Sequence, residues 1–156
     1  MILEKKKVIV TGGAGGIGSE ICKMLLSKGA IVGCVDKNQN RLEKLCNQNK
    51  AFKDNLRTYC IDINDTDSVK SIVAKYYDEF SVIDILINNA AILDDCLLVS
   101  IFGGKIKKHS IERWNQTIGT NLTSYFVFAR EVTEKMLLER TKGLIINISS
   151  ISSAGN

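Results

Sequence analysis

The sequence contains no proline and a single histidine, His109. It has five cysteines, but none of them forms a Cys-x-x-Cys pair, and this excludes the usual cysteine and histidine sites for structural zinc. We therefore expect reduced thiols that pack as small apolar side chains, and we expect no metal. The absence of proline fits a chain with long helices and few tight turns.

Long apolar runs and blocks of like charge are also missing. No segment approaches the ~18 apolar residues of a membrane helix, and the apolar stretch Val8–Val10 is too short for a signal peptide. The net charge of +4 is spread along the chain, without the basic run that is typical of a nucleic-acid tail. We expect one cytoplasmic domain over residues 1–156 that binds neither membranes nor nucleic acids.

Short apolar runs alternate with segments of helical spacing along the chain. Runs of this kind are typical of strands that are covered on both faces of a parallel sheet. We predict five strands, at residues 7–10, 31–35, 56–61, 83–87 and 143–148. We predict helices at residues 17–28, 39–49, 65–80 and 111–140, the last divisible into two pieces, and an irregular segment at residues 91–110. The sequence therefore predicts an α/β fold, a three-layer doubly wound Rossmann-type parallel sheet with strand order 3-2-1-4-5.

Two of the predicted helices have an apolar face that we expect to turn toward the sheet. On the first helix this face consists of Ile17, Ile21, Met24 and Leu25. On the third helix it consists of Val69, Ile72, Val73 and Tyr76. Trp114, Tyr125 and Phe126 lie on the last helices, where we expect core or subunit contacts.

Polar residues stand at the carboxyl end of each predicted strand. They are Thr11, Asp36, Asp62, Asn88, Asn89, Ser149 and Ser150. Parallel strands end at the same edge of a sheet, and ligands of such sheets bind beyond that edge. The sequence therefore predicts one ligand site that is built from the ends of successive strands.

The turn at residues 11–18 joins the first predicted strand to the first predicted helix and contains five glycines. Gly12, Gly16 and Gly18 let the chain turn tightly and let a ligand approach the backbone without a Cβ in the way. The helix that follows directs its free N–H groups and its positive dipole end at the turn, which suits a pyrophosphate. A flexible turn without a ligand is the alternative interpretation.

Asp36 ends the second predicted strand, about 20 residues after the glycines. An acid at this place hydrogen-bonds the ribose hydroxyls of NAD, and its charge repels the 2′-phosphate of NADP. The neighbouring Lys37 weakens that preference. We therefore predict that Asp36 and Lys37 lie in a site for NAD, with NADP less favoured; a turn or helix cap is the alternative role of Asp36.

The spacing Thr11-Gly12-x-x-x-Gly16-Ile17-Gly18 resembles the nucleotide motif of the short-chain dehydrogenase/reductase family. The pair Asp62-Ile63 is similar to the acid-plus-aliphatic pair that contacts adenine in that family. Asn88-Asn89-Ala90-Ala91 resembles its Asn-Asn-Ala-Gly segment, which steadies the central sheet and borders the cofactor, although alanine replaces glycine at position 91. The resemblance implies that the cofactor contacts Gly12, Gly16, Ile17, Gly18, Asp62, Ile63, Asn89 and Ala90.

Two further positions are similar to catalytic positions of the family. Asn121 matches its catalytic-site asparagine, and residues 143–150 resemble its fifth strand, which delivers the catalytic serine at Ser150. The resemblance implies that Ser150 orients a carbonyl group and stabilises charge on its oxygen. Taken alone, Asn121 is also compatible with a buried residue that satisfies backbone groups, and Ser150 with a turn serine.

The chemistry of the family also needs a tyrosine that is followed four residues later by a lysine, on the helix after the fifth strand. The tyrosine exchanges a proton with the substrate, and the lysine lowers the pKa of the tyrosine. None of the four tyrosines of this sequence is followed by lysine at that spacing. We therefore expect a chain that is truncated after the fifth strand, is nearly inactive alone and exposes a sheet edge.

The resemblance implies an NAD(P)-dependent oxidoreductase that transfers hydride between nicotinamide and a carbonyl or alcohol substrate, and an intact family member that forms a homo-oligomer. The long segment at residues 93–108 is similar to that of members that act on sugars or polysaccharide precursors, while fatty-acyl carriers and steroid-like substrates stay open. Two other classes remain. One is a non-catalytic dinucleotide-binding or interaction module from an interrupted gene. The other is an S-adenosylmethionine-dependent methyltransferase, which accounts for Asp36 but not for Asn121 or Ser150.

Overall fold

The computed structural model describes residues 3–94 and 96–150. Its main sheet is parallel and has five strands in the order β3-β2-β1-β4-β7. These strands are β1 (Lys7–Thr11), β2 (Ile31–Asp36), β3 (Leu56–Cys60), β4 (Ile85–Asn88) and β7 (Leu144–Asn147). Since β7 is the fifth strand of this sheet along the chain, the order confirms the predicted doubly wound arrangement 3-2-1-4-5.

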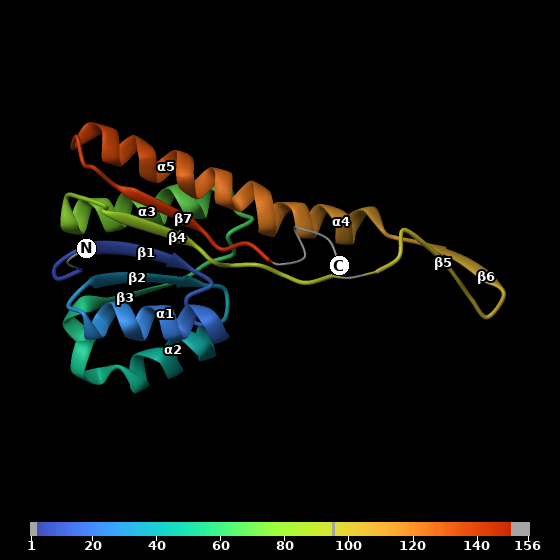
Figure 1. Ribbon diagram of the computed structural model, residues 1–156, viewed down its shortest axis with the longest axis horizontal. Coiled ribbons are helices and arrows are strands. Elements are labelled where there is room, and N and C mark those ends of the chain that lie inside the picture. Colours follow the sequence, from blue (N-terminus) through green and yellow to red (C-terminus); the bar gives the residue numbers. More distant parts are fainter. Residues whose placement is uncertain (1–2, 95, 151–156) are drawn as a thin grey trace.

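The helices cover both faces of the sheet. They are α1 (Gly16–Ser27), α2 (Gln39–Gln48), α3 (Thr66–Phe80), α4 (Ile111–Ile118) and α5 (Ser124–Leu138). Figure 1 shows α1 and α2 on one face and α3 and α5 on the other. The last predicted helix does consist of two pieces, because a π-helical turn at Gly119–Thr123 separates α4 from α5. A 3-10 helix at Lys50–Asn55, after α2, was not predicted.

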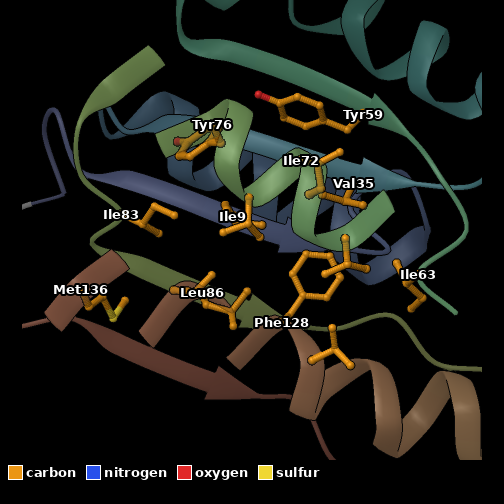
Figure 2. Packing of buried hydrophobic residues seen from close by; sticks show 14 residues of the cluster. Ile9, Val35, Tyr59, Ile63, Ile72, Tyr76, Ile83, Leu86, Phe128 and Met136 are labelled. Carbon is orange, nitrogen blue, oxygen red and sulfur yellow. The ribbon is translucent and has the colours of Figure 1, made fainter. Parts of the chain in front are cut away.

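Alternate side chains of β1 enter the two layers of the core. Val8 and Val10 are buried on the side of α1 and α2, whereas Ile9 is buried on the side of α3 and α5. Figure 2 shows this second layer, where Phe128 of α5 and Tyr76 of α3 lie around Ile9. Burial on both faces of the sheet explains why the sequences of the central strands β1, β2 and β4 are mostly apolar.

The apolar face of α3 was predicted correctly, and its four predicted residues are buried. The face of α1 was predicted in part wrongly, because the side chains of Ile17 and Met24 are 68% and 49% exposed. The face that α1 turns toward the sheet contains Gly18, Cys22 and Leu25. Gly18 packs directly against the turn before the helix, and this close contact sets the rotation of α1 about its axis.

Residues 91–110, predicted to be irregular, contain an antiparallel hairpin of β5 (Val99–Phe102) and β6 (Lys105–Lys108). Gly103 and Gly104 have φ angles of 58° and 71° at its tip, as a two-residue turn of type I′ requires. Figure 1 shows the hairpin beyond α4, pointing away from the sheet. The alternation of apolar and polar residues before a Gly-Gly pair is a hairpin signal that the sequence analysis missed.

Within the described residues, β7 forms one edge of the main sheet. Its Leu144 and Ile146 side chains are 41% and 36% exposed, so the expected apolar edge is present. None of the helices in residues 3–94 and 96–150 is both long and apolar enough to span a membrane.

Candidate functional site

A cleft of about 560 Å³ opens at the carboxyl edge of the sheet, where the turn between β1 and α1 meets the ends of β2, β3 and β4. All ten residues that the sequence analysis assigned to cofactor binding line this cleft: Gly12, Gly16, Ile17, Gly18, Asp36, Lys37, Asp62, Ile63, Asn89 and Ala90. Seven residues that it did not assign line the cleft too: Gly15, Arg41, Ile61, Asn64, Ala91, Ile92 and Thr120. The ends of four of the five strands thus build one site, whereas none of the described residues at the end of β7 lines the cleft.

Glycine stands at different positions of the turn for two different physical reasons. Gly12 has a φ of +60°, and a Cβ on it would lie 2.8 Å from Cα of Ala90. A Cβ on Gly18 would lie only 2.1 Å from the carbonyl oxygen of Gly12. Packing therefore requires both glycines. A Cβ on Gly16, in contrast, would meet nothing within 4 Å, so no contact within the protein accounts for the missing side chain.

The start of α1 is prepared for an anion. Its N-cap residue, Gly15, makes no side-chain cap, and the first turn contains no acidic residue. The N–H groups of the first turn have no partners within the helix, and the helix dipole adds partial positive charge at the same end. Gly15 and Gly16 both line the cleft, so this end of the helix faces it without a side chain in between. A pyrophosphate fits such a place.

Asp36 is nearly buried at the end of β2. Its Oδ2 accepts a hydrogen bond from the backbone N–H of Ala14 at 3.2 Å, and its Oδ1 accepts one from the N–H of Asn38 at 3.0 Å. The first bond ties the glycine turn to β2, so the alternative role of Asp36 in a turn is also present. A carboxylate accepts up to about four hydrogen bonds, so capacity is left for the hydroxyls of a ligand.

The segment after β4 is joined to the glycine turn by four hydrogen bonds. The N–H groups of Asn89 and Ala90 both donate to Oγ1 of Thr11, at 3.0 and 3.1 Å. Nδ2 of Asn89 donates to the carbonyl oxygens of Thr11 and Gly12, at 3.0 and 3.2 Å. These bonds hold the middle of the cleft rigid. They also explain why Gly12 approaches Ala90 so closely.

Asp62 and Ile63 stand at the end of β3. Ile63 is buried and offers an apolar wall, whereas Asp62 is exposed at the rim. Oδ1 of Asp62 accepts hydrogen bonds from both N–H and Nδ2 of Asn64, at 2.9 Å each. An apolar wall next to an oriented carboxylate suits a flat heterocycle with an exocyclic amine.

Asn121 lies in the π-helical turn and is not among the residues that line the cleft. Its Oδ1 accepts a hydrogen bond from the N–H of Ile92, and its Nδ2 donates to the carbonyl oxygen of Ile92, both at 2.9 Å. The side chain thus satisfies backbone groups, which is the alternative that the sequence left open. By doing so, it holds Ile92, which does line the cleft, in place. Single π-helical turns within helices occur often at functional sites.

Ser150 lies three residues beyond the end of β7 and is exposed. It is not among the residues that line the cleft. The chain before it is anchored to β4, because the N–H of Ile148 donates to the carbonyl oxygen of Asn88 at 2.8 Å. Ser150 is therefore at the same edge of the sheet as the cleft, one strand further along.

Arg41 and Asn64 line the cleft but carry no sequence signal of their own. Arg41 is in the first turn of α2, close along the chain to Asp36. Asn64 belongs to the loop before α3, whose N-cap residue is Asp65. In the described part of the chain, no group of three histidine, cysteine, aspartate or glutamate side chains is arranged to hold a metal ion.

This combination of a doubly wound sheet, a glycine turn at an open helix start and an acid at the end of β2 defines a dinucleotide-binding fold. The short chain dehydrogenase family matches residues 6–155. The chain therefore belongs to the short chain dehydrogenase family.

Known relatives agree with this assignment. The acetoacetyl-CoA reductase of Acinetobacter sp. is 36% identical over 151 residues, which are 96% of this chain and 57% of that protein. A short chain dehydrogenase of Bacillus anthracis is 26% identical, with a TM-score of 0.85 over 98% of this chain and 60% of that one. ElxO, solved with NADP bound, is 25% identical, with a TM-score of 0.81 over 97% of this chain and 58% of that one. The chain thus spans little more than half the length of these relatives.

Proposed function

We propose that this chain binds NAD(H) in the cleft and forms the cofactor-binding part of a reductase that acts on a carbonyl or alcohol group. The main support for the proposal is the open space at Gly16, whose missing side chain leaves the uncapped start of α1 accessible. Packing does not require glycine there, whereas a pyrophosphate on the helix start does.

Each wall of the cleft has a proposed part in holding the dinucleotide. The glycine turn and the N–H groups of α1 take the pyrophosphate, and Asp36 accepts hydrogen bonds from the hydroxyls of the adenosine ribose. Ile63 and Asp62 receive the adenine. Asn89 and Ala90 border the central part of the cofactor, where their bonds to Thr11 keep the backbone fixed.

Asp36 makes NAD the proposed cofactor in preference to NADP. Its carboxylate would face a 2′-phosphate at short range, which like charges disfavour. Lys37 and Arg41 line the same cleft, and their positive charges reduce that repulsion. We therefore expect tighter binding of NADH than of NADPH, with a difference that shrinks in Asp36→Asn and grows in Arg41→Ala.

The proposed catalytic residues are Ser150 and Asn121. Bound NAD(H) supplies or accepts the hydride. The hydroxyl of Ser150 hydrogen-bonds the substrate oxygen and stabilises negative charge that develops on it. Asn121 holds the backbone of Ile92 and thereby the wall of the cleft between β4 and α4. The proton donor expected for the family, a tyrosine with a lysine four residues later, does not occur in these 156 residues.

We infer from this that the 156-residue chain alone turns over slowly or not at all, although it binds the cofactor. The substrate class that we favour is a 3-oxoacyl thioester, because a reductase of acetoacetyl-CoA is among its relatives. A sugar or polysaccharide precursor is the second candidate, which the hairpin of β5 and β6 favours as an insertion between β4 and α4. A non-catalytic dinucleotide-binding module is the alternative function, favoured by the missing tyrosine and lysine.

Titration calorimetry of the purified chain tests the proposal. We expect NADH to bind with a 1:1 stoichiometry, NADPH to bind more weakly, and S-adenosylmethionine not to bind. Binding of S-adenosylmethionine without binding of NADH would overturn the proposal. A steady-state assay with NADH and acetoacetyl-CoA then separates the two functions: turnover at the ~1–1000 per second of an ordinary enzyme would contradict the expected inactivity of the chain alone.

A further inference from the structure

Asn64 connects two parts of the cleft that are distant in the sequence. Its N–H and its Nδ2 both donate to Oδ1 of Asp62 at 2.9 Å. Its Nδ2 also donates to Oγ1 of Thr120 at 3.1 Å. A single side chain therefore links the loop after β3 to the π-helical turn between α4 and α5.

Gly119 leaves room for this link. A Cβ on Gly119 would lie 2.6 Å from Oδ1 of Asn64, closer than nonbonded atoms approach each other. Gly119 is the first residue of the π-helical turn. A glycine within a helix lowers the stability of the helix by about 1 kcal/mol relative to alanine. The close approach of Asn64 is a physical reason for glycine at a position where the helix alone would favour alanine.

The π-helical turn that receives Asn64 also carries Asn121. Oγ of Ser124 closes this turn by donating to the carbonyl oxygen of Thr120 at 2.7 Å. Asn121 then binds both backbone groups of Ile92. Hydrogen bonds and the backbone of the turn thus connect Asp62, Asn64 and the 120–121 peptide to Ile92. They run from the β3 side of the cleft to its β4 side.

We propose that Asn64 is a positioning residue for the adenine end of the cofactor. Asn64 occupies Oδ1 of Asp62 with two hydrogen bonds and leaves Oδ2 for a ligand. Thr120 in turn fixes the side chain of Asn64. The orientation of the Asp62 carboxylate and the position of the turn that bears Asn121 are therefore set together. This inference rests on the proposed binding of NAD(H).

Calorimetric titration of the 156-residue chain with AMP, which contains only the adenine end, tests the inference. We compare Asn64→Ala, Thr120→Val, the double variant and Asn47→Ala, a control at an exposed asparagine of α2. Loss of one hydrogen bond corresponds to about a three- to tenfold weaker affinity, which we expect for Asn64→Ala. Thr120→Val keeps the shape of the side chain and removes only Oγ1. We expect Thr120→Val to weaken AMP binding as well, and we expect the double variant to bind AMP no more weakly than Asn64→Ala does.

An NMR measurement distinguishes this role from a general loss of stability. We expect Asn64→Ala and Thr120→Val to shift the amide signal of Ile92 and to speed its hydrogen exchange, while Asn47→Ala leaves both unchanged. The inference would be overturned if Asn64→Ala bound AMP as tightly as the wild type does, or if the losses of AMP affinity were fully additive in the double variant. In either case, NADH binding by the wild type would still support the proposed function. If the wild type binds neither NADH nor AMP, the inference and the proposed function are both overturned. If Asn64→Ala does not fold, Thr120→Val alone decides by the same two measurements.

Discussion

Alanine substitutions at Gly16 and Gly18 separate the role of the glycine turn in folding from its role in binding. Gly18→Ala places a Cβ 2.1 Å from the carbonyl oxygen of Gly12, and the backbone of the turn has to move. We expect this overpacking to lower the free energy of unfolding by about 1–3 kcal/mol. Gly16→Ala places its methyl group in open space. Because alanine favours the helix, we expect a gain of about 0.5–1 kcal/mol.

Binding of NADH should respond in a different way. The methyl group of Gly16→Ala lies where the pyrophosphate approaches the start of α1, and we expect it to displace at least one hydrogen bond to charged oxygen. Such a bond contributes about 1.5–3 kcal/mol, so the affinity for NADH should fall at least about tenfold. Gly16→Ala is thus expected to be more stable than the wild type and to bind more weakly.

Urea unfolding followed by Trp114 fluorescence measures the stability, and calorimetry measures the affinity. Ser27→Ala, at an exposed position near the end of α1, serves as the control for a helix-favouring substitution outside the cleft. Unchanged NADH affinity in Gly16→Ala would refute the assignment of this turn to the pyrophosphate. A destabilised Gly16→Ala would show that the protein itself requires this glycine, and the argument from open space would fail.

Three further predictions concern the core. In the folded chain, the three exposed cysteines should react with a thiol reagent. Cys22 and Cys34 should react only on unfolding, because both are buried. In addition, a hydrogen bond with Cys22 and burial raise the pKa of the Cys34 thiol. Burial raises the pKa of Tyr59 from 10.0 to about 12, so the folded state holds the phenol proton more tightly than the unfolded state does. The free energy of unfolding should therefore be unaffected at lower pH and should fall as the pH rises from 10 to 12. Urea unfolding at each pH would measure this fall. Phe128→Ala should cost about 3–5 kcal/mol of unfolding free energy, whereas Phe126→Ala, at a position 62% exposed, should cost less than about 0.5 kcal/mol; equal losses would contradict the assigned core.

The sheet was predictable because its central strands β1, β2 and β4 are buried on both faces and therefore read as apolar runs, as in Val8–Val10. The glycine turn and the acid at Asp36 were predictable because local backbone geometry and the end of a strand fix their positions. Strand order followed from the handedness of the crossover connections. The edge at which the cleft lies followed from the topology alone.

Other features depend on contacts between distant segments and left no local pattern. The rotation of α1 follows from the packing of Gly18 on the turn, so Met24 faces solvent although its spacing fits the apolar face. Asn64 reaches Thr120 across 56 positions, and nothing near either residue in the sequence indicates the other. The hairpin of β5 and β6 did have a local signal, the Gly103-Gly104 pair, but residues 91–110 were predicted only to be irregular.

We propose that the cleft at the carboxyl edge of the sheet holds a nicotinamide dinucleotide. The most direct measurement is calorimetric titration of the folded wild-type chain with NADH, repeated in the presence of saturating AMP. We expect one NADH per chain and loss of apparent NADH affinity when AMP is present. Folded material that binds no NADH, or that binds it equally well in the presence of AMP, would contradict the assignment of the cleft to this cofactor.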